Sequence, residues 1–538
     1  MRNKVLIICI TILLLGALIL AGCSKTTTTT TNTTTTNTTS PTSTVPTTTT
    51  TSEPDKYGGT LRIIGINDCV GVVGIPWQMT PMTSPVIFPT LDRIINFKSD
   101  GSIEPCLATD WVVADDGKSI TFTLRQDVKF HDGTDFNAEA LKWNLEYWRE
   151  TRQTGTASWT TIEVLDTYTL RINLAMWQST ALSGFGEDYC GPISPTAYQQ
   201  NGEEWAKTHP VGTGPFKLVS LQTGVGWKYE RNDDYWGGKP YLEAIEVQYI
   251  PDLNTIKMML EVGQADIAWW GGSSGMEVKA DLEKKGFELL SYELGGSPHV
   301  MWPDGANADS PLSNKDVRLA IDYAIDRESI AEAIGYGLFE PTYQLVSEIH
   351  PLYNPSLVRS YDPAKARQLL SDAGYESLEL TLNMEDGTPM DWAVAVQDNL
   401  RQVNINLNIN MMATPAAFQL FMTGWQNGFY VSPMSVVPDY QMGFEKWFSQ
   451  KSIFNKSLLK TDELQGLIES ALLARTPEEQ FPLDIQCNEY VFNEVICMPT
   501  FIGRYGGLGI KASYVMDDNF GMLMPNTWTP AKCWLNNK

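Results

Sequence analysis

The chain has 538 residues, of which 43% are hydrophobic, so it is long enough for at least two separately packed lobes. Its 63 acidic and 39 basic residues give a formal net charge of −24, and a surface this acidic disfavours nucleic-acid binding. Only four histidines are present and no cluster has metal-ligand spacing, so we expect no metal site and no cofactor. The 17 tryptophans are typical of a protein that binds a ligand.

The N-terminus has the features of an export signal. Arg2 and Lys4 precede an apolar run, Val5–Leu20, which is short for a membrane span and has the length of a signal-peptide core. The run leads into Leu-Ala-Gly-Cys, ending at Cys23, which resembles the bacterial lipoprotein box. The resemblance implies that residues 1–22 are removed as a signal peptide. It also implies that Cys23 is lipidated, which would anchor the protein to the cell membrane in the periplasm or at the cell surface.

The segment after Cys23 is a predicted tether. Residues 26–51 are mostly threonine, and such a tract cannot bury a core. We therefore expect residues 23–56 to hold a folded body away from the membrane. Six cysteines follow in a compartment that permits disulfides, and they could pair in 15 ways between which the sequence does not choose: Cys69, Cys106, Cys190, Cys487, Cys497 and Cys533.

Alternating apolar and polar residues predict strands in the first half of the folded body. These strands are Gly59–Ile66, Trp111–Val113, Ser119–Arg125, Pro215–Leu221, Trp227–Arg231, Ala244–Ile250 and Ala265–Trp270. The turn Asp116-Gly117 joins two of them into a hairpin. Asn137 and Asp252 are predicted N-caps of two helices, and Met276–Lys285 is a third predicted helix.

The second half is richer in predicted helix. Ser313-x-x-Asp316 has the pattern of a capping box ahead of a helix, and Asp326 starts another that ends near Gly335. Asp362 followed by Pro363 begins a third. Farther on, a helix separates two strands, and this alternation favours α/β lobes: Leu378–Leu382, Trp392–Gln402 and Ile405–Ile409.

Several segments resemble motifs of one protein family, and they occur in the family's order. They are Val128–Glu139, which contains Phe130-His131-Asp132-Gly133, Pro210–Phe216, Asn232–Pro240, Val317–Arg327 and Tyr361–Ala366. The chain thus resembles the family 5 extracellular solute-binding proteins, which are the peptide-, dipeptide- and nickel-type receptors of ABC importers. Within these motifs we expect Phe130, His131 and Trp236 to be structural residues.

The resemblance implies an α/β fold with two lobes, of the type II periplasmic-binding-protein kind, with an extra subdomain and a hinge between the lobes. Lobe one would take residues 57–90, 206–296 and 500–538, the subdomain 91–205, and lobe two 297–499. It further implies a monomeric receptor, without enzymatic activity, that captures a peptide-like or other polar solute. The receptor would deliver it to a membrane permease served by an ATPase.

The resemblance also indicates where a solute would bind. The candidate ligand-binding residues are Trp77, Trp270, Ser273, Trp302, Trp425, Gln426, Asn427 and Asp439. Tryptophan offers a large flat surface that can stack on sugars, rings or peptide planes. Because side chains alternate along a strand, only one of Trp269 and Trp270 can face the cleft.

One departure from the family bears on the solute. In peptide-binding members the segment after the lobe-two tryptophan reads Trp-x-Ala-Asp-Tyr, and its Asp anchors the α-amino group of the peptide. Here Gly428 takes the position of that Asp, and Asp439 could replace it only if the loop is re-routed. We therefore expect free peptides to bind weakly. A neutral polar solute, such as an oligosaccharide or a blocked peptide, fits Gln426, Asn427 and a stacking Trp425 better.

Two other functions stay open. A secreted serine hydrolase is one, because Gly271–Gly275 has the G-x-S-x-G pattern of a nucleophile elbow with Ser273 as the nucleophile. Against this, no His-Gly-Gly oxyanion segment lies upstream, and glycines that let the chain turn explain the pattern better. The formal acid and base pairs for the hydrolase are Asp281 with His299, and Asp309 with His350.

The other function that stays open is a surface lipoprotein that senses its ligand without transport.

Overall fold

Sheets built from distant parts of the chain organise the protein in the computed structural model. The model describes residues 55–536, except for 66–67, 70, 80–82, 84–85, 99–101, 152–155, 157, 187–189, 271–274, 291–295, 435–438, 504–508 and 521–527. The predicted signal segment, Cys23 and nearly all of the predicted tether lie outside the described residues. Ser273 lies outside them as well.

The first large sheet is mixed and joins the first strand of the folded body to a strand from near its C-terminal end. Its order is β12 (Glu288–Leu290), β19 (Gly509–Lys511), β11 (Ile267–Trp269), β1 (Thr60–Gly65), β10 (Ala244–Tyr249), β9 (Gly226–Arg231) and β8 (Phe216–Gln222). Strand β1 runs parallel to β10 and β11, whereas β19 pairs antiparallel with β11 and β12. The five predicted strands of this sheet are therefore confirmed, with ends shifted by one or two residues.

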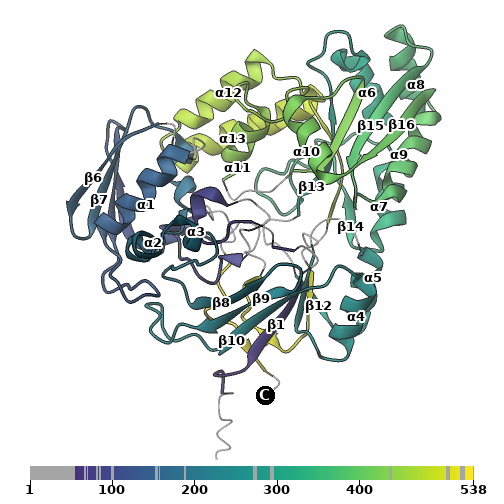
Figure 1. The fold of residues 1–538 in the computed structure, drawn as a ribbon. Helices are drawn as coiled ribbons and strands as arrows, with labels where there is room; N and C mark the ends of the chain where they lie inside the picture. Colours follow the sequence, from purple (N-terminus) through teal and green to yellow (C-terminus); the bar gives the residue numbers. More distant parts are fainter. Residues whose placement is uncertain are drawn as a thin grey trace, which may run out of the picture. The chain divides into compact units, whose positions relative to one another are not determined.

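The second large sheet comes mainly from the second half of the chain (Figure 1). Its order is β14 (Phe339–Pro341), β18 (Met498–Gly503), β13 (Pro298–Pro303), β17 (Gly428–Pro433), β15 (Leu378–Glu385) and β16 (Ile405–Met412). The chain thus passes from the first sheet to the second between Leu290 and Pro298. It returns between Gly503 and Gly509.

A smaller antiparallel sheet lies between β1 and β8 in the sequence. It contains, in spatial order, β4 (Ala108–Val113), β5 (Ser119–Leu124), β7 (Thr169–Leu174) and β6 (Trp159–Asp166). The predicted hairpin at Asp116-Gly117 is confirmed, because β4 pairs with β5 and Gly117 has a φ of +67°. Two short pairs complete the sheets of the described residues: β2 (Ile95–Phe97) with β3 (Ile103–Pro105), and β20 (Val515–Met516) with β21 (Trp534–Leu535).

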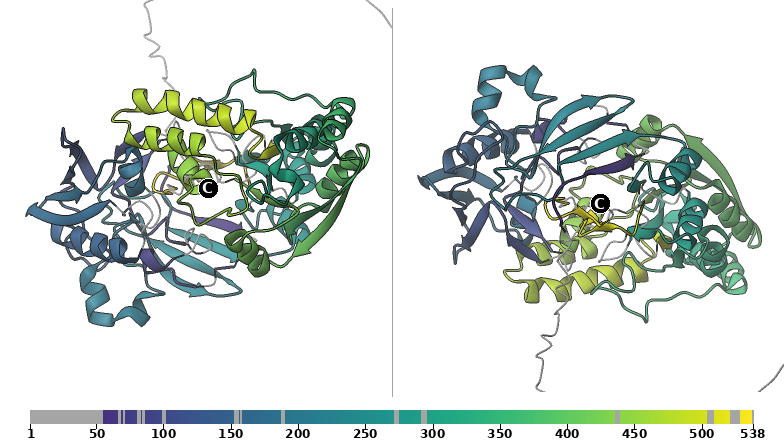
Figure 2. Two further views of the ribbon diagram at one scale, coloured as in Figure 1. Left: turned by 90° about the horizontal axis from the view of Figure 1, so that it is seen from above. Right: turned by 90° about the horizontal axis from the view of Figure 1, so that it is seen from below.

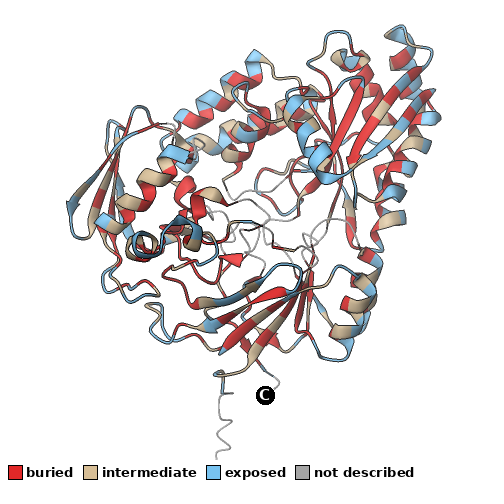
Figure 3. Ribbon diagram, viewed as in Figure 1, coloured by how far each residue is buried: buried red, intermediate tan, exposed pale blue. Residues whose placement is uncertain are grey.

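The helices cover the sheets, with their buried faces turned inward and their exposed faces toward solvent (Figures 1 to 3). In the first half they are α1 (Ala138–Thr151), α2 (Pro195–Asn201), α3 (Glu203–Ala206), α4 (Leu253–Glu261) and α5 (Met276–Lys284). In the second half they are α6 (Lys315–Ala324), α7 (Arg327–Gly335), α8 (Pro363–Asp372), α9 (Met390–Arg401), α10 (Thr414–Thr423), α11 (Tyr440–Phe448), α12 (Asp462–Leu473) and α13 (Pro477–Asn493).

The predicted helix starts are confirmed, with one correction. Asn137, Asp252, Asp326 and Asp362 each accept a hydrogen bond from a backbone N–H in the first turn of their helix. The capping box expected at Ser313 is wrong, because the N-cap of α6 is Asn314, whose side chain accepts from the Asp316 N–H at 2.8 Å. The Ser313 hydroxyl instead donates to the Ser310 carbonyl, since a short 3-10 turn occupies 311–313.

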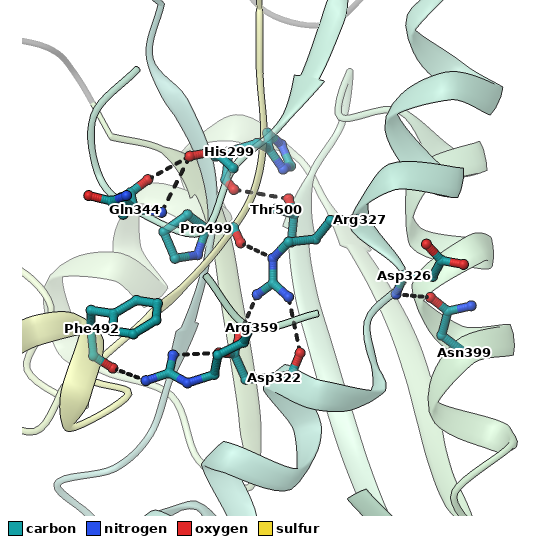
Figure 4. Close-up of polar contacts among 11 residues, drawn as sticks. His299, Asp322, Asp326, Arg327, Gln344, Arg359, Asn399, Phe492, Pro499 and Thr500 are labelled. Carbon is teal, nitrogen blue, oxygen red and sulfur yellow. Dashed lines mark hydrogen bonds and ion pairs between the residues drawn. The ribbon is translucent and has the colours of Figure 1, made fainter. Parts of the chain in front are cut away.

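The family motif at Val317–Arg327 has a structural explanation (Figure 4). The buried Asp322 carboxylate forms ion pairs with Arg327 and, at 2.7 Å, with Arg359. Arg327 Nε donates to the Pro499 carbonyl at 2.7 Å, and Arg359 Nη2 donates to the Phe492 carbonyl at 2.5 Å. The two guanidinium groups thereby attach the chain entering β18 to the α6–α8 side of the second sheet.

Asp322→Asn should destabilise the second sheet strongly. The variant leaves two buried guanidinium groups without their carboxylate, and breaking a buried pair costs about 3–5 kcal/mol of unfolding free energy. Chemical denaturation monitored by circular dichroism measures this loss. Asp398→Asn removes an exposed ion pair with Arg401 and should cost less than about 1 kcal/mol. Equal effects of the two substitutions would contradict the proposed role of Asp322.

Candidate functional site

The turn between α10 and β17 is held in place from two sides. The Ser457 hydroxyl accepts from the Trp425 N–H and donates to the Trp425 carbonyl, both at 2.7 Å. The Asp304 carboxylate accepts from the backbone N–H groups of Asn427 at 2.6 Å and Gly428 at 3.2 Å. The turn is therefore rigid, because its backbone polar groups have fixed partners on two other segments.

This anchored turn exposes two amide side chains. Gln426 and Asn427 are exposed, whereas the neighbouring Trp425 is buried. Neither anchor, Asp304 or Ser457, was predicted from the sequence. A signal for Asp304 exists in the sequence, since a lone acidic residue directly after the apolar strand Val300–Pro303 needs buried hydrogen-bond donors.

A cluster of aromatic rings lies behind the turn. Trp425 packs against Tyr430 with ring centroids 5.4 Å apart, and Trp302 stacks on Trp447 at 5.5 Å. Trp302 Nε1 donates to the Ser432 hydroxyl at 3.0 Å. Within the described residues, the Nε1 groups of Trp425 and Trp447 have no hydrogen-bond partner. Of the candidate residues, Trp302, Trp425, Gln426 and Asn427 are thus brought together by one core and one turn.

Gly428 has a packing reason to be glycine. It pairs with Thr381 of β15, and a Cβ at this position would lie 1.9 Å from the Thr381 carbonyl oxygen. No side chain fits there without movement of the strand. The backbone of Thr381 therefore fills the space that a side chain at position 428 would need.

The remaining tryptophan candidates lie in two other cores. Trp77 is buried and stacks on Tyr147 of α1 with ring centroids 4.9 Å apart. Trp270 is fully buried in the core between the first sheet and helices α4 and α5, with the Lys279 ammonium 4.8 Å from its ring. Burial lowers the pKa of Lys279 to about 7. Trp269 is only partly buried and lies near Phe520, with ring centroids 6.3 Å apart.

The described end of the Gly271–Gly275 segment also requires glycine. Gly275 precedes α5 with a φ of +66°, and a Cβ there would lie 2.8 Å from the Leu253 side chain and 3.0 Å from Trp270 Nε1. The close approach and the left-handed backbone both explain this glycine without any catalytic role.

Asp439 is bonded on both carboxylate oxygens. Oδ2 accepts from the Ser183 hydroxyl at 2.6 Å, and Oδ1 accepts from Gln480 Nε2 at 3.2 Å and from the backbone N–H of Gln441 at 3.1 Å. Burial raises the pKa of Asp439. Asp439 thus serves as the N-cap of α11 and joins two distant segments of the chain.

The proposed acid and base pairs of a hydrolase are not in contact. Asp281 forms ion pairs with Lys257 and Lys285, whereas His299 stacks on Phe501 at 4.8 Å. His350 Nδ1 accepts from the Leu352 N–H at 3.1 Å, and Asp309 is exposed. Burial lowers the pKa of His299 to about 3 and that of His350 to about 4. Both imidazoles are neutral structural groups near pH 7.

The described part of the chain contains no group of three or more His, Cys, Asp or Glu side chains that could hold a metal ion. None of its helices is both long and apolar enough to cross a membrane.

The six cysteines of the folded body are all buried. Burial raises the pKa of Cys69 to about 12 and also raises the pKa values of Cys106, Cys487, Cys497 and Cys533.

Comparison with known proteins identifies the class. A model described as "Bacterial extracellular solute-binding proteins, family 5 Middle" matches residues 102–447. The glutathione-binding protein GsiB of Salmonella paratyphi A is 27% identical over 435 residues, covering 76% of this chain and 83% of that protein. GsiB of Escherichia coli O1:K1 / APEC is 28% identical over 422 residues, covering 74% of this chain and 80% of that protein.

Solved structures share the fold. The periplasmic binding protein DppA of Helicobacter pylori, in complex with peptide STSA, superposes with a TM-score of 0.76 at 22% identity, covering 90% of this chain and 99% of that one. NikA of Brucella suis, in complex with Fe(III)-EDTA, superposes with a TM-score of 0.77 at 22% identity, covering 89% of this chain and all of that one. The predicted two-lobed α/β fold of the periplasmic-binding-protein kind is therefore confirmed.

Together, the fold and the family match define an extracytoplasmic solute-binding protein. The chain belongs to family 5 of the bacterial extracellular solute-binding proteins, whose members are the substrate-binding receptors of ABC importers.

Asp484, on α13 beside Asp439, generates a prediction about pH. Burial, and then the charge of Asp439, raise its pKa from 3.8 to about 7. Between these two values the folded chain keeps a proton that the unfolded chain has lost, so the unfolding free energy falls as pH rises from about 4 to about 7. The pKa shift of Asp484 corresponds to a loss of about 4 kcal/mol of unfolding free energy over this pH range.

Asp484→Asn removes the group that titrates, so the variant should gain stability over the unmodified chain at pH 8 but much less at pH 5. Calorimetric melting temperatures at the two pH values measure the difference. Asp309→Asn, at an exposed aspartate, is the control and should change neither value. A gain of equal size at both pH values would contradict the assignment.

Proposed function

We propose that this receptor captures a neutral or blocked polar solute at the turn Trp425–Asn427 and delivers it to a permease served by an ATPase. The observation that carries the proposal is the turn itself, which Asp304 and Ser457 fix and which presents the exposed amides of Gln426 and Asn427. Side-chain amides both donate and accept, so they match hydroxyl and peptide groups without requiring a charge on the solute.

Neither of the two positions considered for an acidic anchor, 428 and 439, offers a carboxylate without partners, which favours a solute without a free ammonium group. The Gly428 position is filled by the backbone of Thr381, and both oxygens of Asp439 already have donors. A buried ammonium group without a partner is costly. GsiB relatives are named for glutathione, and the solved neighbours hold a peptide or a metal chelate, so peptide-like solutes and small chelates belong in the test set.

The proposed function also assigns the residues of the two lobes and of the subdomain. Lobe one would comprise residues 57–90, 206–296 and 500–538 with the subdomain 91–205, and lobe two residues 297–499. The two passages of the chain between the large sheets support a hinge there, although β18 continues to Gly503 within the second sheet.

We expect a monomer without catalytic activity. Two facts support the lack of catalysis: the His299 ring stacks on Phe501, and the Asp281 carboxylate forms ion pairs with two lysines. Ser273 stays a candidate contact of the solute, whereas Trp77, Trp270 and Trp302 are buried in hydrophobic cores.

Titration calorimetry should separate the solute classes. We expect an N-acetylated peptide pool or an oligosaccharide pool to bind at least tenfold more tightly than a free-amino peptide pool, with glutathione included separately. Gln426→Ala should weaken binding of the preferred solute roughly tenfold, since it removes hydrogen bonds to the solute. Gln419→Ala, an exposed amide on α10, should leave binding unchanged. Tight binding of free-amino peptides that Asp439→Asn abolishes would overturn the solute assignment.

We further propose that residues 1–22 are a signal peptide and that Cys23 carries lipid at the start of the 23–56 tether. The support is the Leu-Ala-Gly-Cys sequence that ends at Cys23. Two acyl chains hold a protein on a membrane stably, whereas one alone does not.

Cys23→Ala should move the protein from the membrane fraction to the soluble fraction. Cell fractionation followed by intact-mass measurement detects both the location and the added lipid. Cys9→Ala changes only the segment proposed to be removed, so it should leave the mass and location of the mature protein unchanged. A Cys23→Ala protein that remains on the membrane with residues 1–22 attached would refute the lipoprotein assignment.

A further inference from the structure

A short segment of the small sheet's subdomain contacts the helices of lobe two. Trp177 Nε1 donates to the Ala474 carbonyl at 2.7 Å, and the Ser179 hydroxyl donates to the Ala471 carbonyl at 3.0 Å. The Ser183 hydroxyl donates to Asp439 Oδ2 at 2.6 Å. Three donors from 177–183 thus meet acceptors at the ends of α11 and α12 that lie 256 to 297 residues away in the sequence.

Two further contacts extend this interface. The Arg475 guanidinium lies 5.3 Å from the centre of the Trp177 ring. On its other side it approaches the β4–β5 turn, where a Cβ added to Gly117 would lie 2.0 Å from Arg475 Nη1. The Trp177 ring and the Ser183 hydroxyl are buried, so the contact excludes water.

The two sides of this interface belong to different hydrophobic cores. The subdomain shares one continuous core with the first large sheet, as Ile63 of β1 and Ile120 of β5 belong to the same cluster of buried residues. The buried faces of α11, α12 and α13 belong to the cluster around Trp302 and Tyr430. If the lobes move about the two chain passages, each core moves as a unit and the interface at 177–183 must separate.

The chemistry of the interface suits a contact that forms and breaks. It consists chiefly of single hydrogen bonds and one cation–π contact, each weak enough to exchange for water. The Ser183 hydroxyl covers one oxygen of the Asp439 carboxylate, so this carboxylate has its partner across the interface instead of water.

From these observations we propose that residues 177–183, with the ends of α11 and α12 and Arg475, form a latch between the subdomain and lobe two. The latch holds the subdomain against lobe two in the arrangement seen in the structure. It contributes to the balance between this arrangement and one in which the two have separated, without touching the solute. The inference rests on the proposed function only in that it assumes lobe motion, and its test uses the solute-free chain.

Hydrogen exchange followed by mass spectrometry tests the latch directly. Ser183→Ala and Arg475→Ala each remove one latch contact, so amide exchange in 177–183 and 471–476 of the solute-free chain should accelerate roughly two- to tenfold. Exchange in β5, β7, β13 and β15 should stay unchanged, because neither core is altered. Ser470→Ala is the matched control, since its exposed hydroxyl donates only within α12, to the Gly466 carbonyl.

Three results would overturn the latch. Unchanged exchange in both variants would mean that these contacts do not limit the opening of the interface between the subdomain and lobe two. Acceleration throughout the subdomain or throughout lobe two would mean that they belong to one rigid core. Acceleration confined to 177–183, with 471–476 unaffected, would mean that the subdomain segment frays locally. None of these outcomes depends on the solute, so they leave the solute assignment to its own titration.

Discussion

The Asp322 carboxylate supports the arrangement on which both lobes depend. It orients Arg327 and Arg359, whose remaining nitrogens bind carbonyls of the chain between Phe492 and Pro499. Arg318, one turn earlier on α6, binds the carbonyls of Glu494 and Val495 in the same way. This segment leads into β18 and then β19, so three buried arginines position the strands that complete the second sheet and extend the first. A buried guanidinium is tolerated here because carbonyls and one carboxylate satisfy its donors.

The family motifs elsewhere in the chain also act through structure. His131 Nε2 lies 2.9 Å from the Gly214 carbonyl, which connects the Phe130–Gly133 motif to the Pro210–Phe216 motif. Trp236 Nε1 and the Tyr235 hydroxyl both donate to the buried Asp92 carboxylate. The segments by which the family is recognised therefore maintain the scaffold. Solute specificity is free to vary at the turns that the scaffold supports, which is why membership of the family does not by itself give the solute.

Long-range packing explains where expectation and structure diverge. The sequence around Gly428 suggests a lost acidic side chain, but the structure adds that the Thr381 carbonyl bars any side chain there. Asp439 was a candidate anchor for a solute, and the structure bonds it to Ser183, 256 positions away in the chain. Strand periodicity indicated that Trp269 and Trp270 point to opposite sides, but only the packing of α4 and α5 decides that Trp270 lies beneath them.

The sequence by itself determined the local elements and the class of protein. Hydrophobic period, turn glycines and N-cap residues fix strands and helix starts within a few neighbouring positions, and the ordered motifs fix the family. The tertiary structure alone decided which side chains meet: Asp304 and Ser457 at the turn before β17, Ser183 with Asp439, and the arginines of α6 with the returning chain. Such contacts join residues 32 to 256 positions apart, and no local pattern records them, because they depend on how the two sheets are assembled from separate stretches of the chain.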